Sequence, residues 1–558
     1  MEHADLNYAW GHAICSGLHA LGVGRIVISP GSRSTPLALA AHRYPELQTQ
    51  VILDERSAAF FALGAAKTSG QPVALIATSG TAISEWLPAV SEADLARVPL
   101  ILLSADRPPE LRQCGANQTM PQVNLFDERC RFSMELPLPD EQLFQSACRY
   151  ACQAVAASRW PLPGPAHLNI PLREPLTPIQ FPTPDSLYPT RVSTPTLAPN
   201  DRHLTQIAEA ISGLPGLIIC GPESGTPLPK PQIAQLAEAL NAPLLADPLS
   251  NLRNDSHAKK QLISQYDLAL MSDSFCAKAQ PEWVLRFGAM PISKQLSGFL
   301  SKLDQTRHIL VDPHGRWPDP LHRGSELVQA DPTLVASQLQ QRVSPSPSPY
   351  LRIWQERQQS VQLIVADTAL EEREVVQILM DQLPAEGLLF CGNSLPIRQL
   401  DWFHPGRERA LTIMANRGVS GIDGNIATLL GMASTGDRPV VGMIGDLTLL
   451  HDIGSLAISN KTLNAVILVL DNQGGGIFDH LPQQRLNEHE ALFITPQQVD
   501  LAALARGFGV AYQSTTTAQL GGHLRQALNQ SGVQLLHLRV ERPESLAAHQ
   551  RLWQRLHQ

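Results

Sequence analysis

Cysteine is scarce and scattered in this sequence, and this excludes two common ways of stabilising a fold. There are eight cysteines; the closest pair, Cys148 and Cys152, has three residues between them, and no CxxC or Cys/His cluster occurs. The sequence therefore indicates neither a disulfide framework nor a structural zinc site. We therefore expect reduced thiols in the core.

Long runs of positive charge and long apolar runs are also missing. The net charge is −8, and no Lys/Arg-rich segment occurs, which argues against nucleic acid or an anionic membrane as the main partner. The longest apolar runs, such as 465–470, have the length of a core strand, so no stable membrane insertion is expected. Residues 1–5 include acids and start no apolar stretch, so a secretory signal is not expected. Together these absences predict a soluble, cytoplasmic protein.

Proline is concentrated in two stretches that divide the chain. Residues 181–200 contain five prolines, and residues 343–350 read V-S-P-S-P-S-P-Y. Proline at this density favours extended surface linkers. The 558 residues are therefore predicted to form three domains, with the bounds 1–185, 200–343 and 351–558.

Each predicted domain alternates short aliphatic runs with amphipathic stretches, the pattern of βαβ units around a parallel sheet. We predict an α/β protein of three doubly wound parallel-sheet domains, with a Rossmann-like middle domain. The turn at 221–225 departs from G-x-G-x-x-G, so no bound nucleotide is expected there. The expected strands include 25–29, 73–77, 100–104, 216–220, 283–287, 309–311, 388–391, 440–444 and 465–470.

The first and last domains resemble each other. Residues 63–73 align without a gap against residues 430–440, and the constant offset of 367 pairs Gly64 with Gly431. Upstream, both copies run from a strand into a Gly/Ser turn. We predict a duplicated sheet domain, and the alternative is that two unrelated αβ units look alike over this length.

Acidic and amide side chains stand where strands are expected to end. In the first domain, strand 50–53 leads into Asp54 and Glu55, with a helix expected from about Ser57. Glu55 therefore stands at a carboxyl end, where doubly wound sheets bind ligands. Asp54 is expected only to complement the dipole of the helix.

In the last domain, two strands end in oxygen-bearing turns. One leads into Gly445-Asp446-Leu447, and the next leads into Asp471-Asn472-Gln473-Gly474. Asp446 and Asn472 are 26 residues apart, the length of one helical crossover, so the two strands can be neighbours. A carboxylate, an amide oxygen and a glycine carbonyl suit Mg²⁺ bound to a diphosphate. The predicted metal ligands are Asp446, Asn472 and Gly474.

These motifs resemble those of a known superfamily. G-D-x followed by N-x-G resembles the diphosphate motif of the thiamine diphosphate enzymes, and Glu55 resembles their cofactor-activating glutamate. Within that superfamily, the chain is similar from end to end to a family of synthases of menaquinone biosynthesis, although the middle domain matches least. Leu447 replaces the second glycine of the usual G-D-G, as it does in that family, and Asp471 stands where asparagine is commoner. The similarity rests on residues 28–37, 54–56, 78–81, 104–111, 114–118, 392–394, 416–418, 420–424 and 445–447.

The resemblance implies a transferase that uses thiamine diphosphate and Mg²⁺ or Mn²⁺. It would decarboxylate 2-oxoglutarate and add the succinyl semialdehyde carbanion to isochorismate. Glu55 would hydrogen-bond to the pyrimidine ring of the cofactor, and Ile422 would bend the cofactor. The cofactor would lie between the first domain of one subunit and the last domain of another, which implies at least a homodimer, and a homotetramer is expected. The implied cofactor-binding residues are Pro30, Glu55, Gly392, Asn393, Ile422, Gly445, Asp446, Leu447, Asn472 and Gly474.

Both implied substrates are dianions, so an acidic protein needs a local basic pocket. Arginine suits this role because its planar fork binds a carboxylate through two parallel hydrogen bonds. The substrate-binding candidates, chosen by position and by resemblance, are Ser32, Arg33, Arg107, Asn117, Gln118, Lys294, Ser394, Arg398, Arg417, Ile477 and Phe478.

Two other functions stay open. The first is another thiamine diphosphate-dependent 2-oxo acid decarboxylase or an acetolactate-type synthase. The number of basic candidates disfavours it, because monocarboxylate substrates need fewer cations. The second is a non-catalytic nucleotide-binding or regulatory α/β protein that has kept the fold.

Overall fold

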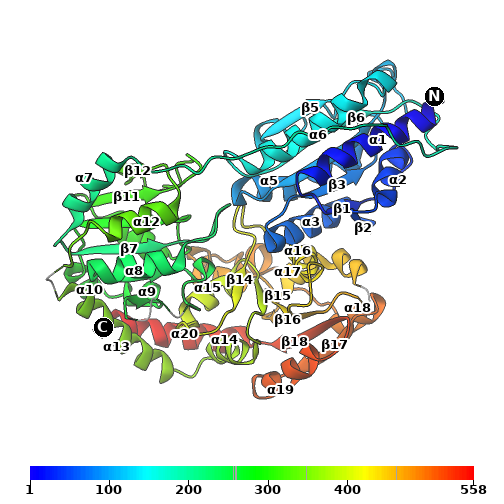
Figure 1. The fold of residues 1–558 in the computed structure, drawn as a ribbon. Helices are drawn as coiled ribbons and strands as arrows, with labels where there is room; N and C mark the ends of the chain where they lie inside the picture. The colour runs from blue at the N-terminus through cyan, green and yellow to red at the C-terminus, as the bar shows by residue number, and fades with distance from the viewer. Residues whose placement is uncertain (256, 258–259, 347–348, 460–461) are drawn as a thin grey trace. The chain divides into compact units, whose positions relative to one another are not determined.

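The computed structural model describes residues 1–558 except 256, 258–259, 347–348 and 460–461 (Figure 1). It contains three six-stranded sheets. Neighbouring strands in each of them run parallel. This confirms the predicted α/β class with three parallel sheets.

The first sheet has the strand order β2-β1-β3-β4-β6-β5. Its strands are β1 (Arg25–Ile28), β2 (Gln48–Val51), β3 (Val73–Ala77), β4 (Leu100–Asp106), β5 (Phe132–Glu135) and β6 (Ala166–Pro171). The helices of this part are α1 (His3–Ala20), α2 (Thr35–Arg43), α3 (Glu55–Ser69), α4 (Thr81–Ser84), α5 (Leu87–Ala96) and α6 (Phe144–Arg159).

Two predicted bounds near Glu55 were wrong. Strand β2 ends at Val51 rather than at Leu53, and helix α3 begins at Glu55 rather than near Ser57. The reason is the N-cap: the carboxylate of Asp54 accepts a hydrogen bond from the Ser57 backbone N–H at 2.7 Å. This bond satisfies one of the free donors of the first turn and fixes the start of the helix.

The middle sheet has the order β12-β11-β10-β7-β8-β9. Numbered within the sheet, this is the 3-2-1-4-5-6 order of dinucleotide-binding folds, read from the other edge. It confirms the Rossmann-like pattern of this part. Its strands are β7 (Gly216–Cys220), β8 (Leu244–Ala246), β9 (Leu262–Ile263), β10 (Trp283–Phe287), β11 (Arg307–Val311) and β12 (Glu326–Val328). Its helices are α7 (Asp201–Ile211), α8 (Lys230–Leu240), α9 (Tyr266–Ala269), α10 (Asp273–Lys278), α11 (Lys294–Leu300) and α12 (Pro332–Gln340).

The third sheet, β14-β13-β15-β16-β18-β17, repeats the strand order of the first sheet position by position. Its strands are β13 (Leu388–Cys391), β14 (Thr412–Met414), β15 (Val440–Gly445), β16 (Ala465–Asp471), β17 (Ala511–Thr515) and β18 (Val533–Arg539). The helices of the last third of the chain are α13 (Tyr350–Ala366), α14 (Glu371–Gln382), α15 (Leu395–Phe403), α16 (Asn425–Ala433), α17 (Asp446–His451), α18 (Leu501–Gly507), α19 (Thr517–Leu528) and α20 (Arg542–His557).

By its contacts the chain forms two compact units. The first unit contains residues 1–194, 416–437 and 448–463; the second contains 195–415, 438–447 and 464–558. The second unit therefore holds the middle and third sheets, and apolar residues from both sheets belong to one buried cluster. The strands of each sheet fall within one predicted domain, while the domain bounds 1–185, 200–343 and 351–558 stay a prediction.

Helices α3 and α16 are the equivalent helices of the two sequence copies, and they pack together in the first unit (Figure 1). A Cβ atom on Gly64 would lie well under 3.0 Å from the Thr428 carbonyl oxygen, and one on Gly431 would clash in the same way with the carbonyl of Phe61. Phe61 and Thr428 are themselves 367 residues apart. The contact is thus symmetric between the copies, which supports the predicted duplication.

The remaining segments bear on the predicted linkers and on the absences in the sequence. Residues 181–200 contain no helix or strand; in the second proline-rich stretch, residues 347–348 lie outside the described part of the chain. The eight cysteines are all free thiols. Among the described residues, no helix has both the length and the apolar character needed to cross a membrane.

Candidate active site

The predicted site residues fall into two groups, one in each compact unit. The first unit contains Pro30, Ser32, Arg33, Glu55, Arg107, Asn117, Gln118, Arg417 and Ile422. The second unit contains Lys294, Gly392, Asn393, Ser394, Arg398, Gly445, Asp446, Leu447, Asn472, Gly474, Ile477 and Phe478.

Glu55 is the first residue of α3 and is half-buried. Burial raises the pKa of its carboxyl above the ordinary value, and the negative charges of Asp54 and Glu85 act in the same direction. With a raised pKa, the carboxyl stays protonated up to a pH closer to neutral, as the predicted role of Glu55 requires.

The loop that carries Ile422 is held from both sides. The Asn425 side chain donates to the carbonyl oxygens of Gly421 at 3.2 Å and Asp423 at 2.9 Å. Behind it, the buried carboxylate of Asp452 accepts from the backbone N–H groups of residues 426 and 427 at 2.8 and 3.0 Å. The half-buried Ile422 side chain therefore projects from a fixed loop at the start of α16.

Arg33 is buried, with 2% of its surface exposed. Its guanidinium donates to the Leu172 carbonyl at 2.8 Å and pairs with Glu174 at 2.7 Å, while its buried Nε has no partner among the described residues. Burial lowers the pKa of this guanidinium, and so does the positive charge of Arg107. The two predicted substrate arginines therefore lie close enough to repel each other, and a bound anion would reduce this repulsion.

Arg107 is tied to the loop that carries the two predicted amides. Its Nε and Nη2 donate to the Asn117 carbonyl at 3.1 and 3.0 Å. The Gln118 amide donates to the Ser79 carbonyl at 2.9 Å, and the Ser79 hydroxyl donates to the Gln118 carbonyl at 3.0 Å. Gln118 has a φ of 54°, a left-handed conformation that non-glycine residues adopt at a cost and that is common at functional sites.

Sequence reasoning missed the buried Gln122, which anchors the same loop. Its amide donates to Asn169 at 3.1 Å and to the Ala105 carbonyl at 3.2 Å, and it accepts from the Gly80 N–H at 2.9 Å. Asn169 in turn donates to Asp106, the last residue of β4, at 2.8 Å. No local motif marks Gln122, because all of the partners of its side-chain amide named here are distant in sequence.

Sequence reasoning also missed Glu92, which holds the segment of Arg417. This buried carboxylate accepts from the backbone N–H groups of Gly418 at 2.9 Å and Val419 at 2.7 Å, and it pairs with Lys67 at 3.3 Å. Burial lowers the pKa of Lys67. Within its own helix Glu92 looks like an ordinary acid, so only the folded chain identifies it.

In the second unit, a turn after β13 carries three of the predicted residues. Asn393 is buried, and Ser394 has a φ of 73° directly before α15. Arg398 donates from Nη1 to the Ser394 carbonyl at 2.6 Å. The polar groups of Ser394 and Arg398 are thereby brought to the start of one helix.

The predicted metal ligands lie at the ends of two adjacent strands, because β15 and β16 pair in parallel as expected. Burial, followed by the charge of Asp471, raises the pKa of Asp446 to about 7. Its carboxylate accepts from the Gly474 N–H at 2.7 Å, and the buried Oδ1 of Asn472 has no partner among the described residues. A divalent cation would compensate both the desolvated carboxylate and the unpaired amide oxygen, so these residues fit the metal.

The structure gives a different reason for the glycines after Asn472. A Cβ on Gly474 would clash with the Ile494 carbonyl, and one on Gly475 with the Phe493 carbonyl. These glycines are therefore required by the close approach of residues 493–494, and not only by space for a diphosphate. Among the described residues, no group of three or more His, Cys, Asp or Glu is placed to hold a metal, consistent with a site of mixed oxygen ligands.

The apolar candidates and the lysine lie on helical segments of the second unit. Ile477 and Phe478 are half-buried in a 3-10 helix at residues 476–480, and Leu447 is half-buried in α17. Lys294 is exposed at the first position of α11, after its N-cap Ser293.

The chain matches models of a known enzyme family in three consecutive segments. Residues 9–127 match the thiamine pyrophosphate enzyme N-terminal TPP binding domain. Residues 212–391 match the middle domain of thiamine pyrophosphate enzymes, and residues 400–538 match the C-terminal TPP binding domain.

Proteins from several bacteria are similar to this chain along nearly its whole length, and the following three bear the name 2-succinyl-5-enolpyruvyl-6-hydroxy-3-cyclohexene-1-carboxylate synthase. The protein of Dechloromonas aromatica (strain RCB) is 43% identical over 96% of this chain and 98% of its own length. That of Chloroflexus aurantiacus is 39% identical over 99% and 96%, respectively. That of Bacillus cytotoxicus is 39% identical over 98% and 96%.

Proposed function

Because the chain belongs to the 2-succinyl-5-enolpyruvyl-6-hydroxy-3-cyclohexene-1-carboxylate synthase family of thiamine diphosphate enzymes, we propose that it forms this compound from 2-oxoglutarate and isochorismate with release of CO₂. The observation that carries the proposal is similarity over nearly the full length of chain and relative alike. The half-buried Glu55 and the pair Asp446 and Asn472 support it from the structure.

Thiamine diphosphate, when bound, supplies the carbon centre that stabilises the negative charge left by decarboxylation. Asp446, Asn472 and Gly474 would hold Mg²⁺ or Mn²⁺ against the diphosphate. The unpaired Oδ1 of Asn472 and the desolvated carboxylate of Asp446 support this assignment. The cofactor itself would contact Pro30, Glu55, Gly392, Asn393, Ile422, Gly445 and Leu447.

Glu55 would hold a proton at a ring nitrogen of the aminopyrimidine. For this task the carboxyl must be poised between its charged and neutral forms near neutral pH. Burial at the start of α3 moves its pKa in that direction. Ile422, held by Asn425, would set the bend of the cofactor from a rigid loop.

The basic residues would bind the carboxylates of the two dianions. In the first unit, Arg33 and Arg107 lie close enough to interact electrostatically, and Arg417 lies in the segment that Glu92 anchors. In the second unit, Lys294 is the first residue of α11, and Arg398 lies in the first turn of α15. Guanidinium groups fixed by backbone carbonyls lose little side-chain entropy when a carboxylate binds.

The deciding experiment is incubation with 2-oxoglutarate, isochorismate, thiamine diphosphate and Mg²⁺, with the product mass measured. We expect the succinyl adduct only when both substrates are present, and loss of the reaction after chelation of the metal. Turnover of pyruvate in place of 2-oxoglutarate would instead favour an acetolactate-type synthase. No 2-oxoglutarate-dependent CO₂ release at all would favour the non-catalytic alternative.

The assembly and the location of the protein also belong to the proposal. We propose a homodimer at minimum and a homotetramer by the sequence prediction, which sedimentation equilibrium with the cofactor would test. The cytoplasmic location stays a prediction from the sequence.

A further inference from the structure

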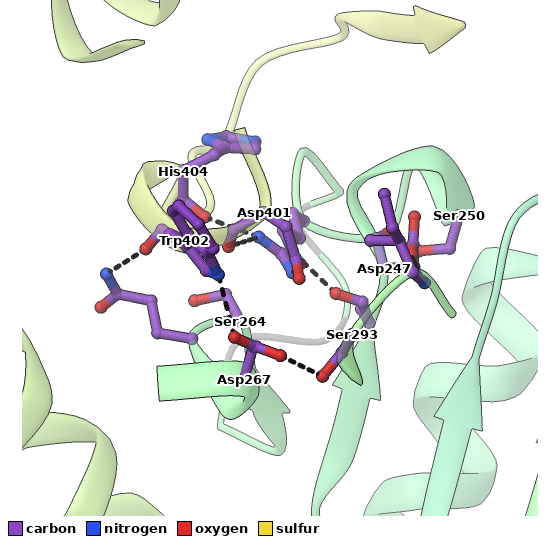
Figure 2. Close-up of polar contacts among 12 residues, drawn as sticks. Asp247, Ser250, Ser264, Asp267, Ser293, Asp401, Trp402 and His404 are labelled. Atoms are coloured by element: carbon purple, nitrogen blue, oxygen red, sulfur yellow. Dashed lines mark hydrogen bonds and ion pairs between the residues drawn. The ribbon is translucent and has the colours of Figure 1, made fainter. Parts of the chain in front are cut away.

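Asp267, a buried carboxylate in α9, joins two helices that each carry a predicted substrate cation (Figure 2). Its Oδ1 accepts from the Ser293 hydroxyl and, at 3.3 Å, from the Gln295 N–H. Its Oδ2 accepts from the indole N–H of Trp402 at 2.9 Å. All of these groups lie in the second unit.

The first pair of contacts fixes the start of α11. Ser293 is the N-cap of this helix, and its hydroxyl oxygen also accepts from the Leu296 N–H at 2.9 Å. Asp247, a second buried carboxylate, accepts from the Ile292 N–H at 3.0 Å. Two buried carboxylates therefore determine where α11 begins, and its first residue is Lys294.

The remaining contact fixes α15. Trp402 lies four residues after Arg398 on this helix, which places the two side chains on the same face. The indole packs against the rings of His549 and Trp553, so its orientation is constrained on its other side as well. The carboxylate of Asp267 thus spans two segments more than 100 residues apart in sequence.

The neighbouring contacts hold the same parts of the chain together without reaching α11. Buried Arg253 donates to the carbonyls of Asp401 at 2.8 Å and His404 at 3.1 Å and pairs with the Asp401 carboxylate. The Ser264 hydroxyl donates to the Pro405 carbonyl at 2.6 Å. These bonds attach the middle part of the chain to the last turn of α15 and to the residues that follow it. Asp267 differs from these groups because its hydrogen bonds reach both the start of α11 and α15.

We propose that Asp267 is a positioning residue that sets Lys294 and Arg398 at a fixed separation, so that together they bind a dicarboxylate substrate. This inference rests on the proposed function, because it takes from it the assignment of the two cations. A carboxylate is suited to the task because it accepts from both helices at once, one through each oxygen. An asparagine would present an amide N–H to one of the two donors and lose that bond.

The test compares Trp402→Phe and Asp267→Asn with Ser264→Ala. The control removes one partly buried hydrogen bond of the same network, which does not reach α11. Hydrogen exchange of residues 294–300, read by mass spectrometry, reports on α11 without any substrate. We expect faster exchange there in both test variants, although Trp402→Phe changes only α15, and unchanged exchange in the control.

The same variants are then assayed for turnover. We expect the KM of at least one dicarboxylate to rise about tenfold in the test variants, the effect of one lost hydrogen bond to a charged group, with kcat nearly unchanged. The control should keep both constants. Trp402→Phe keeps the inference testable if Asp267→Asn does not fold.

Three outcomes separate the possible failures. Unchanged exchange of residues 294–300 in Trp402→Phe would overturn the inference, whether or not the enzyme turns over. A KM that rises equally in Ser264→Ala would reduce Asp267 to a general stabilising contact and would also overturn it. If the wild-type protein forms no adduct, but exchange of residues 294–300 is faster in the two test variants, the proposed function is refuted. The coupling of the two helices then still stands.

Discussion

Replacing Gly64 by alanine is expected to force α3 and α16 apart. Alanine favours a helix over glycine by about 1 kcal/mol, which by itself would stabilise the variant. The new methyl group, however, would lie well under 3.0 Å from the Thr428 carbonyl, a backbone atom that cannot rotate away. Overpacking of this kind costs about 1–3 kcal/mol and sometimes more. Since the whole helix must shift, we expect a cost near the upper end of this range, about 3 kcal/mol. After the gain of about 1 kcal/mol is subtracted, the net loss is about 2 kcal/mol.

The duplication supplies the controls for this prediction. Gly431→Ala should cost a similar amount, because its methyl would meet the Phe61 carbonyl in the equivalent way. The double variant should lose less than the sum, since one displacement makes room for both methyl groups. Gly522→Ala in α19 is the matched control: nothing lies within 4 Å of its Cβ position, so it should be stabilised by up to about 1 kcal/mol.

Thermal and urea unfolding of the apoprotein would measure these effects. For a compact unit of this size, each kcal/mol corresponds to a Tm change of about 2–4 °C. If Gly64→Ala or Gly431→Ala were as stable as the wild type, while Gly522→Ala behaved as expected, the close helix contact would not exist in solution.

Three further changes test the site and its surroundings. Glu55→Gln should keep cofactor affinity but lower kcat by about 10²–10⁴-fold, the usual contribution of a positioned proton donor or acceptor, and a nearly full rate would contradict its role. Asp446→Ala should abolish the Mg²⁺-dependent part of thiamine diphosphate binding in a calorimetric titration, and an unchanged affinity would count against the metal site. His167 is buried, which lowers its pKa from 6.5 to about 4, so between these pH values the unfolded chain binds more protons than the folded chain. Its contribution to the free energy of unfolding should therefore fall as the pH falls from 6.5 to 4, by roughly 3 kcal/mol in all, and His167→Gln should flatten that part of the pH profile of stability.

The strands of the fold could be predicted because their sequence signals are local. β7, β10 and β13 have the predicted bounds, and each is a buried strand of mainly apolar residues, with Arg286 the one charged residue among them. The error at β2 has a physical cause of the same kind. Val51 and Leu53 look like strand residues, but both are exposed. Asp54 caps the helix that begins at Glu55, two residues after Leu53. A side-chain cap therefore overrode the apolar pattern.

The candidate site could be predicted only in part, because its support is not local. Glu55, Asp446 and Asn472 follow strands and belong to recognisable patterns. Glu92 and Asp267 belong to none, although each accepts from donors far away in the chain, at residues 418 and 402 in these two cases. A single acid within a helix gives no sign in sequence of which distant backbone or indole group it will bind. Such residues become visible only when the chain is folded.

The duplication explains why one helix contact can affect chemistry as well as stability. The offset that pairs Gly64 with Gly431 also pairs Glu55 with Ile422, so the two residues proposed to act on the cofactor's pyrimidine and on its bend occupy equivalent positions in the two copies. Glu55 begins α3, and Ile422 lies in the loop directly before α16. Since the cofactor is expected to lie between two subunits, Glu55 and Ile422 of one chain would act on different cofactor molecules. Forcing these helices apart should displace each residue from its own cofactor. We therefore expect Gly64→Ala and Gly431→Ala to lower kcat at temperatures where both variants remain folded. Full kcat in a destabilised Gly64→Ala variant would show that the helix contact sets only stability, and that Glu55 and Ile422 are positioned independently of it.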